Sequence, residues 1–345
     1  MLKEKNEAVY MKKDFRGEIW LNVNDEIFDA MKKVNSEPVD GGYGKDSYSL
    51  KAEELMQRNF KDKIWTTCAI SGTAANVMAL KSMLDRASTV LCAEQTHINC
   101  YECGAAEYTL GNKILSIASR DGKMTIPLLN RLLLATKKYK YRHKVVVITQ
   151  PTEFGTVYTV NELKELTDYV HSLGMYVYLD GARIGNAADA LGVGLTEMIE
   201  YPDIDAFSFG GTKSGAMFGE MIVFRRKEFA ENLEFMQKQS LQHMSKSKFL
   251  GVQLEYILEN DLWLKNAKIS NEKARYLQSK LAEKGIKPFY EVQSNMVFCV
   301  LSESQLANIT AVYDLHYWDE FDKTVRIALN SETSKQAIDE LVSLI

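Results

Sequence analysis

Residues 145–183 read VVVITQPTEFGTVYTVNELKELTDYVHSLGMYVYLDGAR, and this stretch decides the fold class. It begins with Val145–Thr149, a β-branched run typical of a strand that is buried on both faces. A helical pattern over Val160–Leu173 stops at Gly174, and Met175–Leu179 then predicts another strand. A strand, a helix and a second strand in this order favour an α/β domain with a mostly parallel sheet.

The same alternation continues on both sides of this stretch. Upstream, Ile64–Ile70 and Thr89–Ala93 predict short strands, and a helical pattern over Ala74–Arg86 lies between them. Downstream, Asp205–Phe209 and Met221–Phe224 predict two more strands. We therefore expect a large domain in which helices flank a mostly parallel central sheet.

The C-terminal third of the chain has a different pattern. Long charged helical segments run from Glu228 to Lys284, with few strand signals. They indicate a smaller α+β domain joined to the first by helix, so we expect the large domain at residues 14–240 and the small domain at 241–345. The elements expected after these helices are two strands and a closing helix: Met296–Leu301, Val325–Leu329 and Ser331–Leu344.

The composition is that of an ordinary globular protein, with 46% hydrophobic and 26% charged residues. The 42 Lys and Arg against 46 Asp and Glu give a net charge of -4, which argues against a nucleic-acid partner. No apolar run approaches the roughly 20 residues that span a bilayer, and residues 1–18 lack the apolar stretch of a secretory signal. The odd number of cysteines, five, does not suggest a disulfide framework. We therefore expect a soluble protein of the reducing cytoplasm, without a membrane partner.

Ser71, Gly72 and Thr73 directly follow the first expected strand, at the start of a helix. Ligands of open α/β sheets bind at the carboxyl ends of the strands. Free N–H groups at a helix start, two hydroxyls and a glycine that permits close approach would form an anion cradle. The alternative is a plain capped helix without a ligand.

Asp180 and Arg183 lie at the end of the strand Met175–Leu179, in the segment YLDGARIG. A carboxylate that is buried at a strand end needs a cationic partner to stay ionised. Two interpretations stay open at this point: a structural ion pair between Asp180 and Arg183, or a carboxylate that faces the cation of a cofactor.

Lys213 lies in SFGGTKSG, just past the strand Asp205–Phe209. The two glycines before it let the backbone turn tightly and bring the amine toward the end of the sheet. A lysine held in a partly desolvated site has a lowered pKa and can form a Schiff base.

These segments are SGTAAN at 71–76, DGAR at 180–183 and SFGGTKSG at 208–215, and together they resemble the low-specificity threonine aldolases. That group belongs with the aromatic β-eliminating lyases among the fold-type I enzymes that depend on pyridoxal 5′-phosphate. The resemblance covers most of the chain from about residue 14. It extends to EQTHINCYECGAAE at 94–107, PTEFGTVYT at 151–159, SKSKFLGVQL at 245–254 and TVRIAL at 324–329.

The resemblance implies a site for pyridoxal phosphate. Some relatives also carry a bound cation, but this sequence shows no cluster of ligands that would predict a metal. Lys213 would hold the cofactor covalently, Asp180 would pair with its protonated pyridine nitrogen, and His97 would stack on its ring. The helix start would bind its phosphate. The implied cofactor-binding residues are therefore Ser71, Gly72, Thr73, His97, Asp180, Arg183 and Lys213.

The resemblance also implies retro-aldol cleavage of L-threonine or L-allo-threonine, small amino acid substrates, to glycine and an aldehyde. Arg183 and Arg326 would hold the substrate carboxylate. A base must take the proton of the β-hydroxyl group, and His97 is the first candidate and Glu153 the second. The alternatives are β-elimination from a hydroxy or aromatic amino acid, racemisation on the same cofactor, or a non-catalytic binding protein with this fold.

The chain departs from this family near its N-terminus. Relatives often show a Phe-Arg-Ser-Asp pattern whose serine helps to bind the substrate carboxylate, whereas residues 15–18 here read FRGE. The serine hydroxyl is therefore missing at Gly17. Tyr43 and Asp46 resemble a segment that relatives contribute to the substrate site across a subunit interface. Fold-type I relatives are homodimers or dimers of dimers, so the resemblance implies a homodimer or homotetramer.

Overall fold

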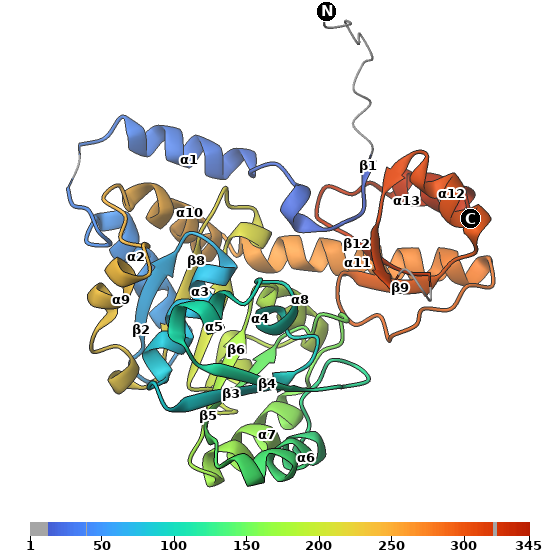
Figure 1. The fold of residues 1–345 in the computed structure, drawn as a ribbon. Coiled ribbons are helices and arrows are strands. Elements are labelled where there is room, and N and C mark those ends of the chain that lie inside the picture. The colour runs from blue at the N-terminus through green and yellow to red at the C-terminus, as the bar shows by residue number, and fades with distance from the viewer. Residues whose placement is uncertain (1–12, 39, 320–322) are drawn as a thin grey trace, which may run out of the picture.

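The computed structural model describes residues 13–38, 40–319 and 323–345, and a seven-stranded sheet forms its centre (Figure 1). Its strands are β2 (Trp65–Ala69), β3 (Ser88–Ala93), β4 (Lys113–Ile117), β5 (Arg142–Thr149), β6 (Tyr176–Asp180), β7 (Ala206–Gly210) and β8 (Glu220–Phe224). They follow the order β2-β8-β7-β6-β5-β3-β4. All neighbours from β7 to β4 are parallel, and β8 is antiparallel to both β7 and β2. The mostly parallel sheet is thus confirmed.

Helices cover both faces of this sheet, and the long helix Leu262–Glu283 leads from it to a second, smaller sheet (Figure 1). Within the described residues, no helix is both long and apolar enough to cross a membrane. Residues 1–12, which carry most of the expectation about a secretory signal, lie outside the described residues. The helices are α1 (Asp25–Asn35), α2 (Ser47–Gln57), α3 (Gly72–Met83), α4 (His97–Cys100), α5 (Ala105–Leu110), α6 (Ile126–Thr136), α7 (Val160–Ser172), α8 (Ile184–Leu191), α9 (Leu233–Gln239), α10 (Lys248–Glu259), α11 (Leu262–Glu283), α12 (Glu303–Thr310) and α13 (Lys335–Ser343).

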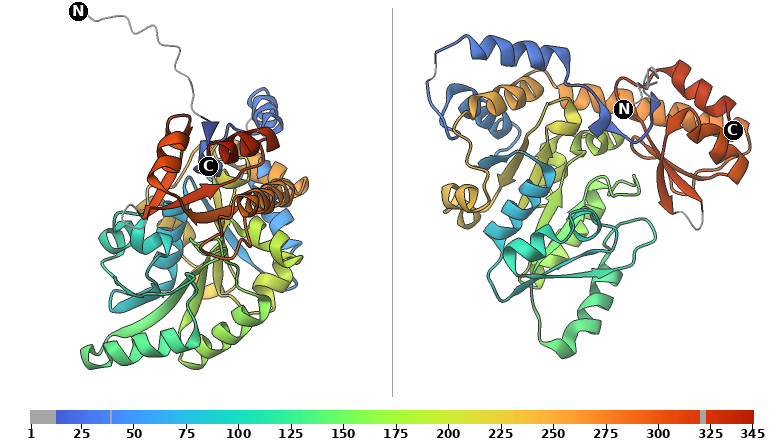
Figure 2. Two further views of the ribbon diagram at one scale, coloured as in Figure 1. Left: turned by 90° about the vertical axis from the view of Figure 1, so that its right-hand side faces the viewer. Right: turned by 45° about the horizontal axis from the view of Figure 1, so that its top comes forward.

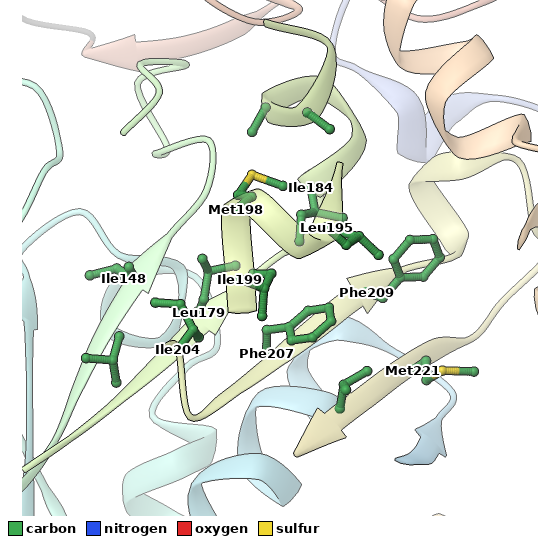
Figure 3. Packing of buried hydrophobic residues seen from close by; sticks show 14 of the residues in the cluster. Ile148, Leu179, Ile184, Leu195, Met198, Ile199, Ile204, Phe207, Phe209 and Met221 are labelled. Atoms are coloured by element: carbon green, nitrogen blue, oxygen red, sulfur yellow. The ribbon is translucent and has the colours of Figure 1, made fainter. Parts of the chain in front are cut away.

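Alternate side chains of β5 pack on opposite faces of the sheet, which explains the unbroken apolar run in the sequence. Val146 and Ile148 belong to a large buried cluster that includes residues of α7, α8 and α10. Val145 and Val147 belong to a second cluster that includes residues of α3. Figure 3 shows part of the large cluster, in which Ile148 and Phe207 of the sheet lie among apolar side chains of the helical layer.

Among the local details that differ from the sequence-based expectations are the bounds of one helix and the presence of one strand. Helix α3 spans Gly72–Met83 and not Ala74–Arg86. It stops early because Asp85 forms a turn, in which its carboxylate accepts from the N–H of Ala87 and the hydroxyl of Ser88. Strand β4 was not expected, because it is a sheet edge and its sequence, KILSI, has no continuous buried run.

The smaller sheet has the order β11-β12-β9 and is antiparallel throughout. Its strands are β9 (Met296–Val300), β11 (His316–Asp319) and β12 (Thr324–Ala328). With α11, α12 and α13 it surrounds a buried cluster of its own, which confirms the expected α+β unit. Figure 2 shows that this C-terminal unit lies far from α6 and α7.

The N-terminal segment is attached to this small unit. Strand β1 (Lys13–Asp14) pairs in parallel with β10 (Tyr313–Asp314), and the N–H of Ala328 donates to the carbonyl of Phe15 at 2.8 Å. The first described residues are therefore attached to the small unit, and the chain passes from there to the large sheet.

A boundary between the two domains at residue 240 stays a prediction. Helix α10 packs against α1 and α2, and Leu254 and Trp263 belong to the cluster of the large sheet. Further along α11, Ala274 and Leu277 belong to the cluster of the small sheet. This packing favours a boundary inside α11.

Candidate active site

A cavity of about 450 Å³ lies at the carboxyl ends of the parallel strands. It receives the segments that follow β2, β3, β5, β6 and β7, together with β12 of the small sheet. Eight residues singled out in the sequence line it: Ser71, Gly72, Thr73, His97, Glu153, Arg183, Lys213 and Arg326.

Tyr43 does not lie in this cavity. It is 53% exposed and lines a separate cavity of about 400 Å³, where its ring packs on His243 with centroids 4.3 Å apart. Asp46 is buried and holds the start of α2, because its carboxylate accepts from the N–H of Ser49 at 2.9 Å. Within one copy of the chain, these two residues are therefore not part of the site.

Helix α3 presents its N-terminus to the cavity. Ser71 caps the helix and accepts from the N–H of Ala74 at 3.3 Å, as the plain structural interpretation predicts. A Cβ added at Gly72 would meet nothing within 4 Å, so the space beside this helix start is open. The first N–H groups of a helix have no partner within it, so the start of α3 can also bind an anion.

Asp180 is the last residue of β6 and is buried. Its Oδ2 accepts from Nδ2 of Asn76 at 3.0 Å, and its Oδ1 accepts from the N–H of Ala182 at 3.0 Å. The ion pair with Arg183 considered from the sequence is not formed. Within the part of the chain that the structure describes, no arginine, lysine or histidine forms an ion pair with Asp180, so this buried carboxylate can receive a cation from a ligand.

Arg183 pairs instead with Glu18. Its Nε lies 2.9 and 3.1 Å from the two carboxylate oxygens of Glu18, and Asn295 donates to the same carboxylate at 2.6 Å. Its two Nη atoms form no hydrogen bond with the described residues, although Arg183 lines the cavity. Glu18 follows Gly17, which has a φ of 121° and would place a Cβ 3.3 Å from that of Ala328.

Lys213 follows β7 in a short 3-10 helix over Thr212–Ser214. Burial, followed by the positive charge of Arg183, lowers its pKa. The two preceding glycines are required by close approaches. A Cβ at Gly210 would lie 2.2 Å from the carbonyl oxygen of Ala182, and one at Gly211 would lie 2.4 Å from that of Gly219.

Arg326 reaches the cavity from the small sheet. Burial and the nearby charge of Arg183 lower its pKa, and its Nε has no hydrogen-bond partner among the described residues. Two guanidinium groups from different domains thus share one cavity. Such an arrangement fits an anionic ligand group that accepts from both.

His97 lies in the wall of the cavity, with Nδ1 2.8 Å from Oε1 of Glu102. Burial alone would lower the pKa of His97. The bond with Glu102 and the charges of Glu153 and Asp180 outweigh burial and raise it. Glu153 lines the same cavity, so both candidate bases are present.

The residues at or beside the site that sequence reasoning missed include Glu18, Asn76, Glu102 and Glu220. Asn76 and Glu102 lie inside quoted motifs, and Glu18 replaces the aspartate of the family pattern, so their segments were available as signals. Glu220 lines the cavity and accepts from the N–H of Gly211 at 3.0 Å. Burial raises the pKa of Glu220 to about 7.

The model of the beta-eliminating lyase family matches residues 22–304. The chain belongs to this family. The family resemblance drawn from the motifs is confirmed by curated relatives that share most of their length with this chain. The low specificity L-threonine aldolase of a Pseudomonas species is 34% identical over 295 residues, which cover 85% of each chain. That of Pseudomonas aeruginosa is 33% identical over 300 residues, or 86% of each chain.

Solved structures of this family and beyond it agree with the fold. The threonine aldolase of Leishmania major superposes with a TM-score of 0.91 at 27% identity, over 96% of this chain and 98% of that one. A serine palmitoyltransferase of Sphingomonas wittichii superposes with a TM-score of 0.73 at 13% identity, over 96% and 86% of the two chains. The expected fold class of this beta-eliminating lyase family member is therefore confirmed.

Proposed function

We propose that this chain is a pyridoxal phosphate-dependent aldolase. It cleaves L-threonine, L-allo-threonine and related β-hydroxy-α-amino acids to glycine and an aldehyde. The observation that carries the proposal is the cavity itself. It brings a lysine of lowered pKa and two arginines together beside Asp180, a buried carboxylate without a cationic partner among the described residues. The names of the Pseudomonas and Leishmania relatives support the same reaction.

The residues at the cavity fit pyridoxal phosphate. Asp180 offers a buried negative charge for the protonated pyridine nitrogen, and the open space beside Gly72 at the start of α3 suits the phosphate. The lowered pKa of Lys213 favours the neutral, nucleophilic amine, which would hold the cofactor. When bound, the cofactor supplies an electron sink for the cleavage of the Cα–Cβ bond.

The arginines bind and orient the substrate carboxylate. Glu18 holds Arg183 through Nε, which leaves the two Nη atoms to donate to a planar anion. Arg326 approaches from the small sheet, and its unpartnered Nε can donate to the same group. This clamp takes over from the serine that is missing at Gly17.

His97 accepts the proton of the β-hydroxyl group. Its Nδ1 is engaged by Glu102, so Nε2 is the ring nitrogen that remains for the substrate. Glu153 is the second candidate, directly or through one water. Its negative charge, together with that of Asp180, favours the protonated form of His97 that results from this step.

The enzyme is proposed to act as a homodimer or homotetramer. Tyr43 lies outside the cavity of its own chain and is exposed, so it can contribute to a substrate site only in another copy. The five free thiols support a reducing cytoplasmic location.

The test is product analysis with purified protein loaded with pyridoxal phosphate, with Lys213→Ala as the blank. Aldehyde and glycine from L-threonine or L-allo-threonine support the proposal. Ammonia and a keto acid without aldehyde would establish β-elimination instead. Substrate with inverted configuration at Cα, without cleavage, would indicate racemisation. Bound cofactor with no consumption of any hydroxy amino acid would indicate a binding protein.

A further inference from the structure

A continuous line of hydrogen bonds lies beneath the cavity wall and joins His97 to Asp180. Oε1 of Glu102 lies 2.8 Å from Nδ1 of His97 and accepts from Nδ2 of Asn76 at 2.7 Å. The same Nδ2 donates to Oδ2 of Asp180 at 3.0 Å. The line therefore runs His97–Glu102–Asn76–Asp180, and it connects the candidate base to the carboxylate proposed for the cofactor nitrogen.

The orientation of the Asn76 amide follows from its neighbours. Ionised carboxylates only accept hydrogen bonds, so the amide nitrogen must face Glu102 and Asp180 and give one hydrogen to each. The amide oxygen then faces the hydroxyl of Tyr178, which donates to it at 2.8 Å. Asn76 and Tyr178 are both buried, so this arrangement excludes the flipped amide, which would place an acceptor against two carboxylates.

The burial of the Glu102 carboxylate costs free energy, and packing alone does not explain why the carboxylate lies there. Its side chain is 0% exposed, and its Oε2 has no hydrogen-bond partner in the described part of the chain. Burial raises the pKa of Glu102, and the bonds with His97 and Asn76 oppose that rise. A buried carboxylate with one unsatisfied oxygen is costly, so its position next to His97 points to a functional role.

We infer that Glu102 and Asn76 are positioning residues for the two ends of this line. Glu102 holds His97 in the tautomer with its hydrogen on Nδ1, which leaves Nε2 as the acceptor for the substrate. Asn76 fixes the Glu102 and Asp180 carboxylates relative to each other, so the base and the partner of the cofactor nitrogen keep a constant separation. The role of His97 as base rests on the proposed function, whereas the two structural links, from Glu102 to His97 and from Asn76 to Asp180, do not.

The first experiment titrates His97 by NMR in the pyridoxal phosphate-loaded enzyme, with its signal identified by a His97→Asn variant among the five histidines. In Glu102→Gln the pKa of His97 should fall by about one unit or more, because the neighbouring negative charge is removed. The charges that remain near the ring are Glu153, Asp180 and Lys213, and they are common to all variants. Glu107→Gln is the matched control: it removes an exposed carboxylate five residues away and should leave this pKa unchanged.

Kinetics separate positioning from a general structural effect. Glu102→Gln should lower kcat about 10- to 100-fold with KM within about twofold, as for other groups that orient a histidine through its second ring nitrogen. The pH at which kcat/KM rises should move down with the pKa of His97. If Glu102 were merely structural, the substitution would lower kcat through a loss of folded protein, and the pH at which kcat/KM rises would stay the same.

The role of Asn76 is tested separately, by measuring the affinity for pyridoxal phosphate in an absorbance titration. Asn76→Ala should weaken binding about tenfold, because Asp180 loses one of its two donors, whereas Glu102→Gln should change it less than about twofold. Tyr178→Phe keeps the ring and loses only the hydroxyl, so it should give a smaller change in the same direction even if Asn76→Ala folds poorly.

Unchanged His97 titration in Glu102→Gln, or unchanged affinity in both Asn76→Ala and Tyr178→Phe, would overturn the inference. If the wild type releases no aldehyde, the proposed function fails, but the titration and the affinities still decide these links.

Discussion

Asp180 and Asp205 are both buried carboxylates on neighbouring parallel strands, one at the carboxyl end of β6 and the other just before the amino end of β7. Asp205 accepts from Nε2 of His171 at 2.8 Å, from Nε of Arg226 at 2.8 Å and from the N–H of Val177 at 2.7 Å. Asp180 accepts only from a neutral amide and a backbone N–H in the described structure.

The difference separates stability from function along a single pair of strands. At the amino end, Arg225 and Arg226 also bind Asp203, so charged groups are matched within the chain. At the carboxyl end, Asp180, Lys213 and Arg326 keep capacity for a ligand. A substitution at the amino end should therefore lower stability and leave activity unchanged. A substitution at the carboxyl end should lower activity and leave stability unchanged.

The largest effect is expected for Lys213→Ala at the carboxyl end. Aldehyde release should fall at least about 10³-fold, because the amine proposed to hold the cofactor is gone. Stability of the cofactor-free protein should not fall, since burial already disfavours the charged lysine. Urea unfolding and an aldehyde assay on the same preparation measure both. Clear destabilisation by Lys213→Ala would break the comparison.

The reverse profile is expected for Asp205→Ala at the amino end. The substitution removes the acceptor of His171 Nε2, of Arg226 Nε and of the buried N–H of Val177, while Arg226 keeps its bond to Asp203. It should cost about 3 kcal/mol of unfolding free energy. The kcat of the protein that remains folded should be unchanged. Asp62→Asn is the control, because its side chain is 75% exposed on the rim of the same network and should have little effect. A lowered kcat with wild-type stability would contradict this prediction.

Glu220 should give the carboxyl end a stability that depends on pH. Burial raises its pKa from 4.5 in the unfolded chain to about 7 in the fold, so the neutral acid is the form that the fold favours. Its contribution to stability is fully present below pH 4.5 and is lost as the pH rises through about 7. Glu220→Gln removes this dependence, and its stability relative to wild type should be higher at pH 8 than at pH 5 by up to about 3 kcal/mol. Urea midpoints of the cofactor-free proteins at the two pH values measure this, and a constant difference would show that Glu220 is not held neutral.

The smallest of these effects is expected for Arg326→Lys. Lysine keeps the charge but loses the planar pair of donors, so KM for L-threonine should rise about tenfold while kcat changes little. Unfolding free energy should stay close to wild type, because the Nε of Arg326 has no partner to lose among the described residues. A fall in kcat at constant KM would place Arg326 at the reacting bond and not at the carboxylate.

The sequence could predict most of the fold because buried parallel strands carry unbroken β-branched runs, as β5 does. It could not predict β4, whose short edge sequence has no such run, nor the end of α3, which the turn at Asp85 decides. At the site, the motifs indicated Lys213 and Asp180. The partner of Arg183 could not be predicted, because Glu18 lies 165 residues away in the chain and only the fold brings them together.

The pairing of the chain's first described strand with its last domain has a consequence for synthesis. Glu18 is synthesised before all seven strands of the large sheet, yet it is held beside Arg183 by a segment anchored on β10 and β12. Arg326, which lines the same cavity, is synthesised after these strands, on β12. A chain that stops before β10 and β12 therefore lacks both Arg326 and the anchor of the segment that holds Glu18 beside Arg183. The two arginines of the cavity are brought together only once β12 has been made and folded.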